Sequence, residues 1–126
     1  MTGLAETSLS ADERALIERF VQDLRVRLDG PVHAVWLFGS RARGERPSAV
    51  ESDVDVLVLV DDASWDGRML VRKVLDDAAR ELRLDSLTWS FSVHVHTPAW
   101  LAQRREIRSF FIAEVDRDKV IVSGQA

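Results

Sequence analysis

The sequence predicts an α/β fold in which a small mixed β-sheet is flanked by helices. Two short apolar segments rich in β-branched residues, "VHAVWLF" and "DVDVLVLV", have the composition of buried strands. A third segment, "LTWSFSVHVH", alternates strictly between apolar and polar residues, and segments with helical periodicity separate it from the other two. This order of helix, two strands, helix, strand, helices and a last strand is typical of one α/β domain.

Capping signals and periodic apolar residues indicate where the helices lie. Ser10 and Glu13 have the spacing of a capping box, and the periodic segment that follows ends at "DGP", residues 29–31. A second periodic segment covers about residues 64–84. Thr97 and Pro98 resemble an N-cap and a first helical position, "SFFIAEV" continues as helix, and "KVIV" is expected to be an edge strand.

The segment "LTWSFSVHVH" is expected to form one half-buried strand. Its alternation predicts that one face packs in the core and that the other is polar. The predicted core face comprises Leu87, Trp89, Phe91, Val93 and Val95, and the polar face includes Ser90, Ser92, His94 and His96.

Composition limits the classes of function. The chain has 126 residues, no cysteine and a net charge of -4, and no segment has the pattern of a signal peptide or a membrane span. We therefore expect a cytoplasmic protein, with residues 1–9 as a flexible N-terminus and residues 10–126 as a single domain. The lack of a basic surplus argues against a protein that binds nucleic acid by itself, because phosphate neutralisation supplies much of that affinity.

Asp53 and Asp55 stand at the start of a predicted strand and are two residues apart, so both side chains are expected on the same face. Two adjacent carboxylates repel each other unless a cation or a proton lies between them. Oxygen ligands that leave positions open for water and phosphate are typical of Mg²⁺ sites. The pair therefore indicates a magnesium site, although Asp-X-Asp at a strand start is also common as a cap and a solvated edge.

The preceding segment, "FGSRARG", has the features of a phosphate-binding turn. Gly39 permits close approach of a ligand to the backbone, and Ser40 can donate a hydrogen bond to a phosphate oxygen. Arg41, Arg43 and Arg46 add positive charge. Each feature has a structural alternative, a plain turn or a surface charge network, but the combination with the carboxylate pair favours phosphoryl or nucleotidyl transfer.

The segments "GSRARG" and "SDVDVLV" closely resemble the minimal nucleotidyltransferases (MNT) of the DNA polymerase beta superfamily, whose signature is Gly-Ser, a spacer and Asp-X-Asp. The spacer between Ser40 and Asp53 is twelve residues, on the long side for such domains. The resemblance implies a polymerase-beta-like nucleotidyltransferase fold over the single domain.

The resemblance also implies roles for individual residues. Gly39, Ser40 and Arg43 would bind the triphosphate of a nucleotide, with ATP the substrate we expect, and Asp53 and Asp55 would bind one or two Mg²⁺ ions. An acceptor hydroxyl would then attack the α-phosphorus and release pyrophosphate.

One departure from the family pattern concerns the third carboxylate that active members place on a neighbouring strand. The strand expected there carries no acid on its polar face, which leaves His94, Asp85 or no residue in that role. An alternative function is therefore a catalytically weakened module that binds a nucleotide or neutralises a partner.

The resemblance further implies a small helical partner of the HEPN type, in a toxin-antitoxin pair with this chain as the antitoxin. Trp65 and Trp100 are candidates for an exposed contact surface, with burial in the core as the favoured alternative. The acceptor, the preferred base and the oligomeric state are left open, and the long first helix is compatible with a homo-oligomer.

Overall fold

The structure is a computed structural model that describes residue 4, residues 7–45 and residues 53–126. Its strands are β1 (Val32–Phe38), β2 (Val54–Val60), β3 (Phe91–His96) and β4 (Val120–Gly124). Its α-helices are α1 (Ala11–Arg27), α2 (Gly39–Ala42), α3 (Trp65–Glu81), α4 (Pro98–Glu106) and α5 (Phe110–Asp118). The predicted α/β class and the predicted order of elements are confirmed.

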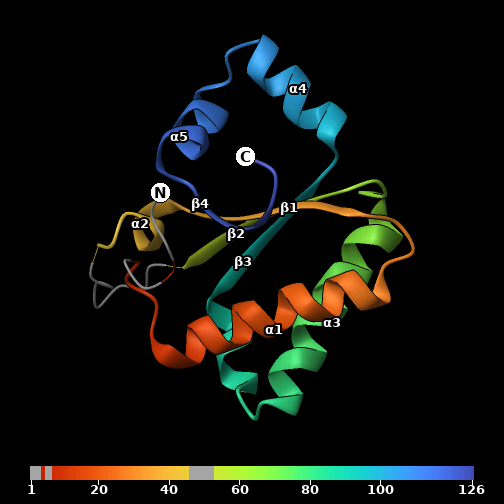
Figure 1. Ribbon diagram of the computed structural model, residues 1–126, viewed down its shortest axis with the longest axis vertical. Helices are drawn as coiled ribbons and strands as arrows, with labels where there is room; N and C mark the ends of the chain where they lie inside the picture. The colour runs from red at the N-terminus through yellow and green to blue at the C-terminus, as the bar shows by residue number, and fades with distance from the viewer. Residues whose placement is uncertain (1–3, 5–6, 46–52) are drawn as a thin grey trace.

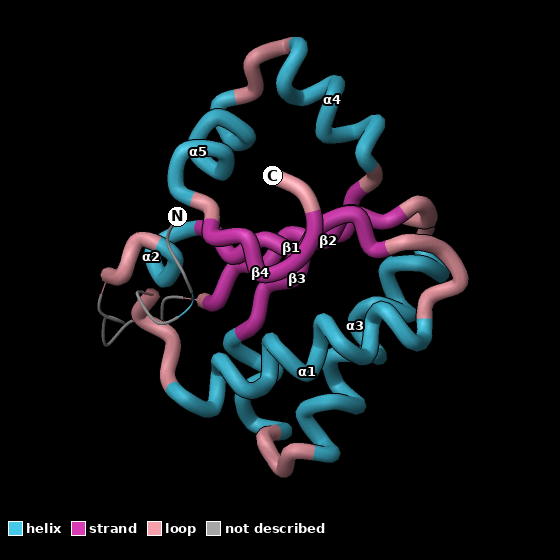
Figure 2. Tube along the Cα trace, viewed as in Figure 1, coloured by secondary structure: helices cyan, strands magenta, loops and turns pink. Residues whose placement is uncertain are grey.

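The four strands form one mixed sheet in the order β3-β2-β1-β4. Strand β1 pairs antiparallel with both β2 and β4, whereas β2 and β3 are parallel, with α3 in the connection between them. Helices α1 and α3 cover one face of the sheet, and α4 and α5 lie over the other (Figures 1 and 2). The last strand, β4, is an edge strand, as the sequence predicts.

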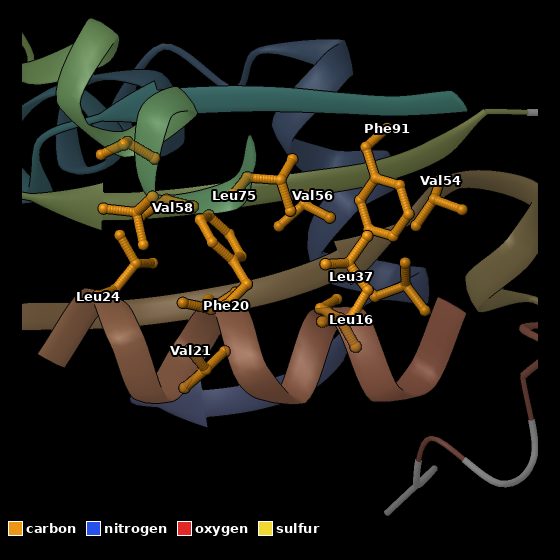
Figure 3. Packing of buried hydrophobic residues seen from close by; sticks show 14 of the residues in the cluster. Leu16, Phe20, Val21, Leu24, Leu37, Val54, Val56, Val58, Leu75 and Phe91 are labelled. Atoms are coloured by element: carbon orange, nitrogen blue, oxygen red, sulfur yellow. The ribbon is translucent and has the colours of Figure 1, made fainter. Parts of the chain in front are cut away.

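The main core lies between the sheet and the helices α1 and α3. Periodic apolar residues of α1, including Leu16, Phe20 and Leu24, meet alternate β2 residues such as Val56 and Val58 in this layer (Figure 3). A smaller cluster on the opposite face joins Trp36 and other strand residues to α4 and α5. Because both faces are covered, β1 and β2 are apolar along nearly their whole length.

The predicted helix boundaries agree closely with the structure. Ser10 accepts a hydrogen bond from the Glu13 N–H while the Glu13 carboxylate accepts from the Ser10 N–H, so the capping box is confirmed. Ser64 caps α3, and Thr97 caps α4 with Pro98 as its first residue. Leu9, inside the segment expected to be flexible, is buried against the main core. No helix in the described part of the chain is long and apolar enough to cross a membrane.

The prediction of a single strand from Leu87 to His96 is wrong in its first half. Residues Asp85–Ser90 form a 3₁₀ helix, and the strand begins at Phe91. The Thr88 and Ser90 hydroxyls donate to carbonyls three residues earlier, which stabilises the tight turn against an extended backbone. As a result Trp89, assigned to the core by alternation, is 91% exposed.

Candidate functional site

The predicted Gly-Ser turn lies where β1 ends and β2 begins, at one end of the sheet (Figure 1). Phe38, the last residue of β1, pairs with Asp55 of β2, and the chain then turns at Gly39 with a φ of +77°. The Gly39 and Ser40 carbonyls accept hydrogen bonds from the N–H groups of Arg43 and Glu45. These bonds close the short helix α2, with the half-buried Ser40 in its first turn.

Gly39 is in close contact with one of the two predicted metal ligands. A Cβ atom at residue 39 would lie 2.5 Å from Oδ2 of Asp55, so the Asp55 carboxylate would have to shift to make room for a side chain. Its positive φ also favours glycine, because a side chain is strained in that region. The backbone of the turn and the Asp55 carboxylate are therefore brought together as the sequence motif requires.

The two aspartates differ in environment. Asp53 is exposed just before β2, and Asp55 is half-buried as the second residue of the strand. By alternation Asp55 shares a face with Leu57 and Leu59, which belong to the cluster under α4 and α5. Burial raises the pKa of the Asp55 carboxyl, nearby His94 acts in the opposite direction, and Asp53 raises it further. A cation between the two carboxylates would relieve this burial cost and this repulsion.

The three arginines of the motif separate into different environments. Arg41 is only 4% exposed and binds Ser8 and the Glu13 carboxylate, so it joins α2 to the start of α1. Its expected contribution to phosphate binding is therefore corrected to a structural one. Arg43 is exposed and pairs with Glu45 and Asp118 at 2.9 and 3.3 Å. Arg46 lies outside the described residues.

Strand β3 supplies the position at which a third carboxylate is expected. Ser92 pairs with Asp55 and His94 with Leu57, so both lie beside the aspartates on the same side of the sheet. The His94 ring is 3.3 Å from the Ser92 hydroxyl and packs on Phe38 at a centroid distance of 5.4 Å. Asp85, the other candidate, instead lines a hollow beside α3 with Asp76 and Arg80.

Asp53 and Asp55 fit the requirements of Mg²⁺, since a pair of carboxylates can hold this ion while its other positions go to water and phosphate oxygens. Within residues 7–45 and 53–126, no three His, Asp or Glu side chains form a cluster able to hold a metal by themselves. The two aspartates alone would leave most coordination positions of such an ion to water and phosphate oxygens.

Helix α5 adds residues near Gly39 that sequence reasoning did not assign to the site. The Phe111 ring lies 5.6 Å from Phe38 and 6.1 Å from His94, and Glu114 follows one turn later. The sequence does contain a signal that could have identified this part of the site. The segment "SFFIAEV" has two phenylalanines besides Ile112 and Val115, which are the residues that this short helix buries in the core.

A mixed sheet that brings a Gly-Ser turn against an Asp-X-Asp strand is the arrangement of a nucleotidyltransferase domain. The family described as "Polymerase beta, Nucleotidyltransferase" matches residues 25–96, from the end of α1 to the end of β3. The matched segment exceeds half of the chain, and the chain belongs to this family. Comparisons with curated proteins and with solved structures gave no match.

Proposed function

We propose that this domain transfers a nucleoside monophosphate from a nucleoside triphosphate, with ATP expected, to an acceptor hydroxyl in a Mg²⁺-dependent reaction. The supporting observation is the contact of Gly39 with Asp55, which joins a phosphate-binding turn to a carboxylate pair. The acceptor oxygen forms a bond to the α-phosphorus, the bond from that phosphorus to the bridging oxygen breaks, and pyrophosphate leaves with the electron pair.

The chain's own residues would contribute mainly by positioning. Gly39 lets the phosphate chain approach the backbone, and Ser40 donates to a phosphate oxygen. Asp53 and Asp55 hold one or two Mg²⁺ ions, which when bound neutralise charge that develops on the phosphate oxygens. The acceptor proton passes to water or to His94, which lies one alternation step nearer to Asp55 along β3 than His96 does.

The test is incubation with Mg²⁺ and each labelled nucleoside triphosphate, with candidate acceptors that include the product of the neighbouring gene and total RNA. Transfer of label that disappears in Asp53→Asn and Asp55→Asn, but persists in the exposed control Asp66→Asn, supports the proposal. Transfer that survives either site substitution contradicts it.

For the acceptor, we propose a small helical protein of the HEPN type, as in toxin-antitoxin pairs of minimal nucleotidyltransferases. The net charge of -4 favours a protein over a nucleic acid. Trp65 is 74% exposed and available for such a contact, whereas Trp100 is half-buried and stacks on His96 at 3.5 Å. Co-purification of the two proteins that is lost in Trp65→Ser supports this surface; unchanged association excludes it.

A second candidate is a module that binds a nucleotide or a partner without catalysis. It is favoured by Ser92, which occupies the strand position paired with Asp55 in place of an acid. This candidate predicts Mg²⁺-dependent ATP binding without transfer to any acceptor. Restoring an acid with Ser92→Asp would then be expected to create or increase transfer.

A further inference from the structure

A pocket of about 250 Å³ opens beside the Gly-Ser turn, between the end of β1 and helix α5. Gly39 and Phe38 form its wall on the sheet side, and Phe111 and Glu114 form its wall on α5. Helices α2 and α5 lie next to each other at this end of the sheet (Figure 1). A nucleotide whose phosphates contact Gly39 would therefore have this pocket within reach of its nucleoside.

The pocket has an aromatic wall suited to a planar ring. Phe38 and Phe111 meet edge to face, with an interplanar angle of 87° and a centroid distance of 5.6 Å. Phe38 is nearly buried, whereas Phe111 is 38% exposed, so part of its ring is open to a ligand. Stacking of a base on such a ring is a common source of nucleotide affinity.

The charges of the pocket argue against phosphate as its occupant. The lining contains two carboxylates, Glu114 and Asp118, and one guanidinium, Arg43. Arg43 is paired with Asp118, which is also paired with Arg117. The lining therefore has no surplus of positive charge. The Glu114 carboxylate can accept a hydrogen bond, and adenine, guanine and cytosine carry exocyclic amino groups able to donate one, whereas uracil has none.

The size of the pocket fits part of a ligand. Sites that enclose a whole small molecule usually have volumes of about 300–1,000 Å³. A pocket of about 250 Å³ beside the turn is smaller than that range and matches a base whose phosphates lie outside it.

We propose that this pocket is the nucleoside subsite of the domain, in which the base stacks on Phe111 and donates its exocyclic amino group to Glu114. This inference rests on the proposed function, because it assumes a nucleoside triphosphate bound at Gly39 and Ser40. Beyond that function, the subsite would make the domain prefer nucleotides whose base carries an exocyclic amino group.

The experiment compares two ligands by calorimetry in Mg²⁺ buffer: ATP and inorganic tripolyphosphate, which lacks a nucleoside. Phe111→Ala should weaken ATP binding roughly tenfold and leave tripolyphosphate binding unchanged. Phe111→Leu keeps the apolar contact with Phe38 and should weaken ATP binding in the same direction. Phe110→Ala is the matched control, because Phe110 is 79% exposed and does not line the pocket.

Base selection provides a second readout on the same proteins. The wild type should bind ATP more tightly than UTP. Glu114→Gln should reduce the difference between the ATP and UTP affinities without changing the affinity for tripolyphosphate. Equal affinity of the wild type for ATP and UTP would refute the role of Glu114.

The outcomes separate the subsite from the proposed function. If tripolyphosphate binds and is lost in Ser40→Ala, but both Phe111 variants bind ATP as the wild type does, the subsite is wrong and the function stands. A parallel loss of both ligands in the Phe111 variants also overturns the subsite. If the wild type binds neither ligand, both proposals are wrong.

Discussion

Replacing Gly39 with alanine should disable the site while the fold survives. The new Cβ would lie 2.5 Å from Asp55 Oδ2, about 0.9 Å short of the 3.4 Å at which ordinary contact begins. The carboxylate must therefore move by nearly 1 Å, a displacement that can lower the rate of a positioned reaction about 100-fold. The φ of +77° adds a backbone cost of roughly 1–2 kcal/mol, which a folded domain of this size can tolerate.

One assay measures the cost to stability, and a second measures how the displaced carboxylate affects nucleotide binding. Urea denaturation should show a decrease in the free energy of unfolding of about 1–2 kcal/mol, and calorimetry should show loss of Mg²⁺-dependent ATP binding. Gly44→Ala is the matched control, since Gly44 has a φ of +80° and is exposed. It should have a similar backbone cost and retain ATP binding. Wild-type ATP affinity in Gly39→Ala would refute the proposed role of this contact.

Three further predictions concern other parts of the domain. Arg41→Ala removes the ion pair between Arg41 and the buried Glu13 and should lower the free energy of unfolding by about 3–5 kcal/mol. Arg43→Ala, at an exposed position, should lower it by less than about 1 kcal/mol. Similar losses for the two variants in urea denaturation would contradict the structural assignment of Arg41. Burial, with Arg68, His94 and Arg104, lowers the pKa of His96 to about 4. As the pH falls, His96 is therefore protonated in the unfolded chain before it is protonated in the folded one, and the free energy of unfolding should fall by roughly 1–2 kcal/mol between about pH 6.5 and 4. His96→Gln should remove the share of this decrease that comes from His96. If the variant and the wild type lose stability equally over this pH range, the low pKa of His96 is not its cause. Asp55→Asn removes a half-buried charge beside Asp53. Without Mg²⁺, the melting temperature of this variant at pH 7 should therefore equal or exceed that of the wild type. A clear decrease in melting temperature would mean that the Asp55 carboxylate stabilises the fold.

The sequence predicted those parts of the fold that local patterns determine. The capping box at Ser10 and the Thr97-Pro98 start are local signals, and both agree with the structure. Alternation around Trp89 was misleading, because the hydroxyls of Thr88 and Ser90 stabilise a 3₁₀ turn that apolar periodicity does not reveal.

The site was predictable only where its residues belong to one continuous motif. Gly39 directly follows Phe38, which pairs with Asp55 across the adjacent strands β1 and β2, so the contact of Gly39 with Asp55 follows from the motif. The burial of Arg41 depends on α1, and the approach of Phe111 depends on how α5 packs on the sheet. Neither follows from the sequence around these residues, since each is fixed by a contact between segments far apart in the chain.

The most direct test of the account is calorimetric titration of wild type and Asp55→Asn with ATP, each in Mg²⁺ and in EDTA. If Gly39, Ser40 and the aspartate pair bind a metal-nucleotide complex, the wild type will bind ATP in Mg²⁺ and lose most affinity in EDTA. Asp55→Asn will bind weakly in both buffers. Equal ATP affinity of wild type and Asp55→Asn in Mg²⁺ would contradict the central claim that this carboxylate pair holds the metal and its nucleotide.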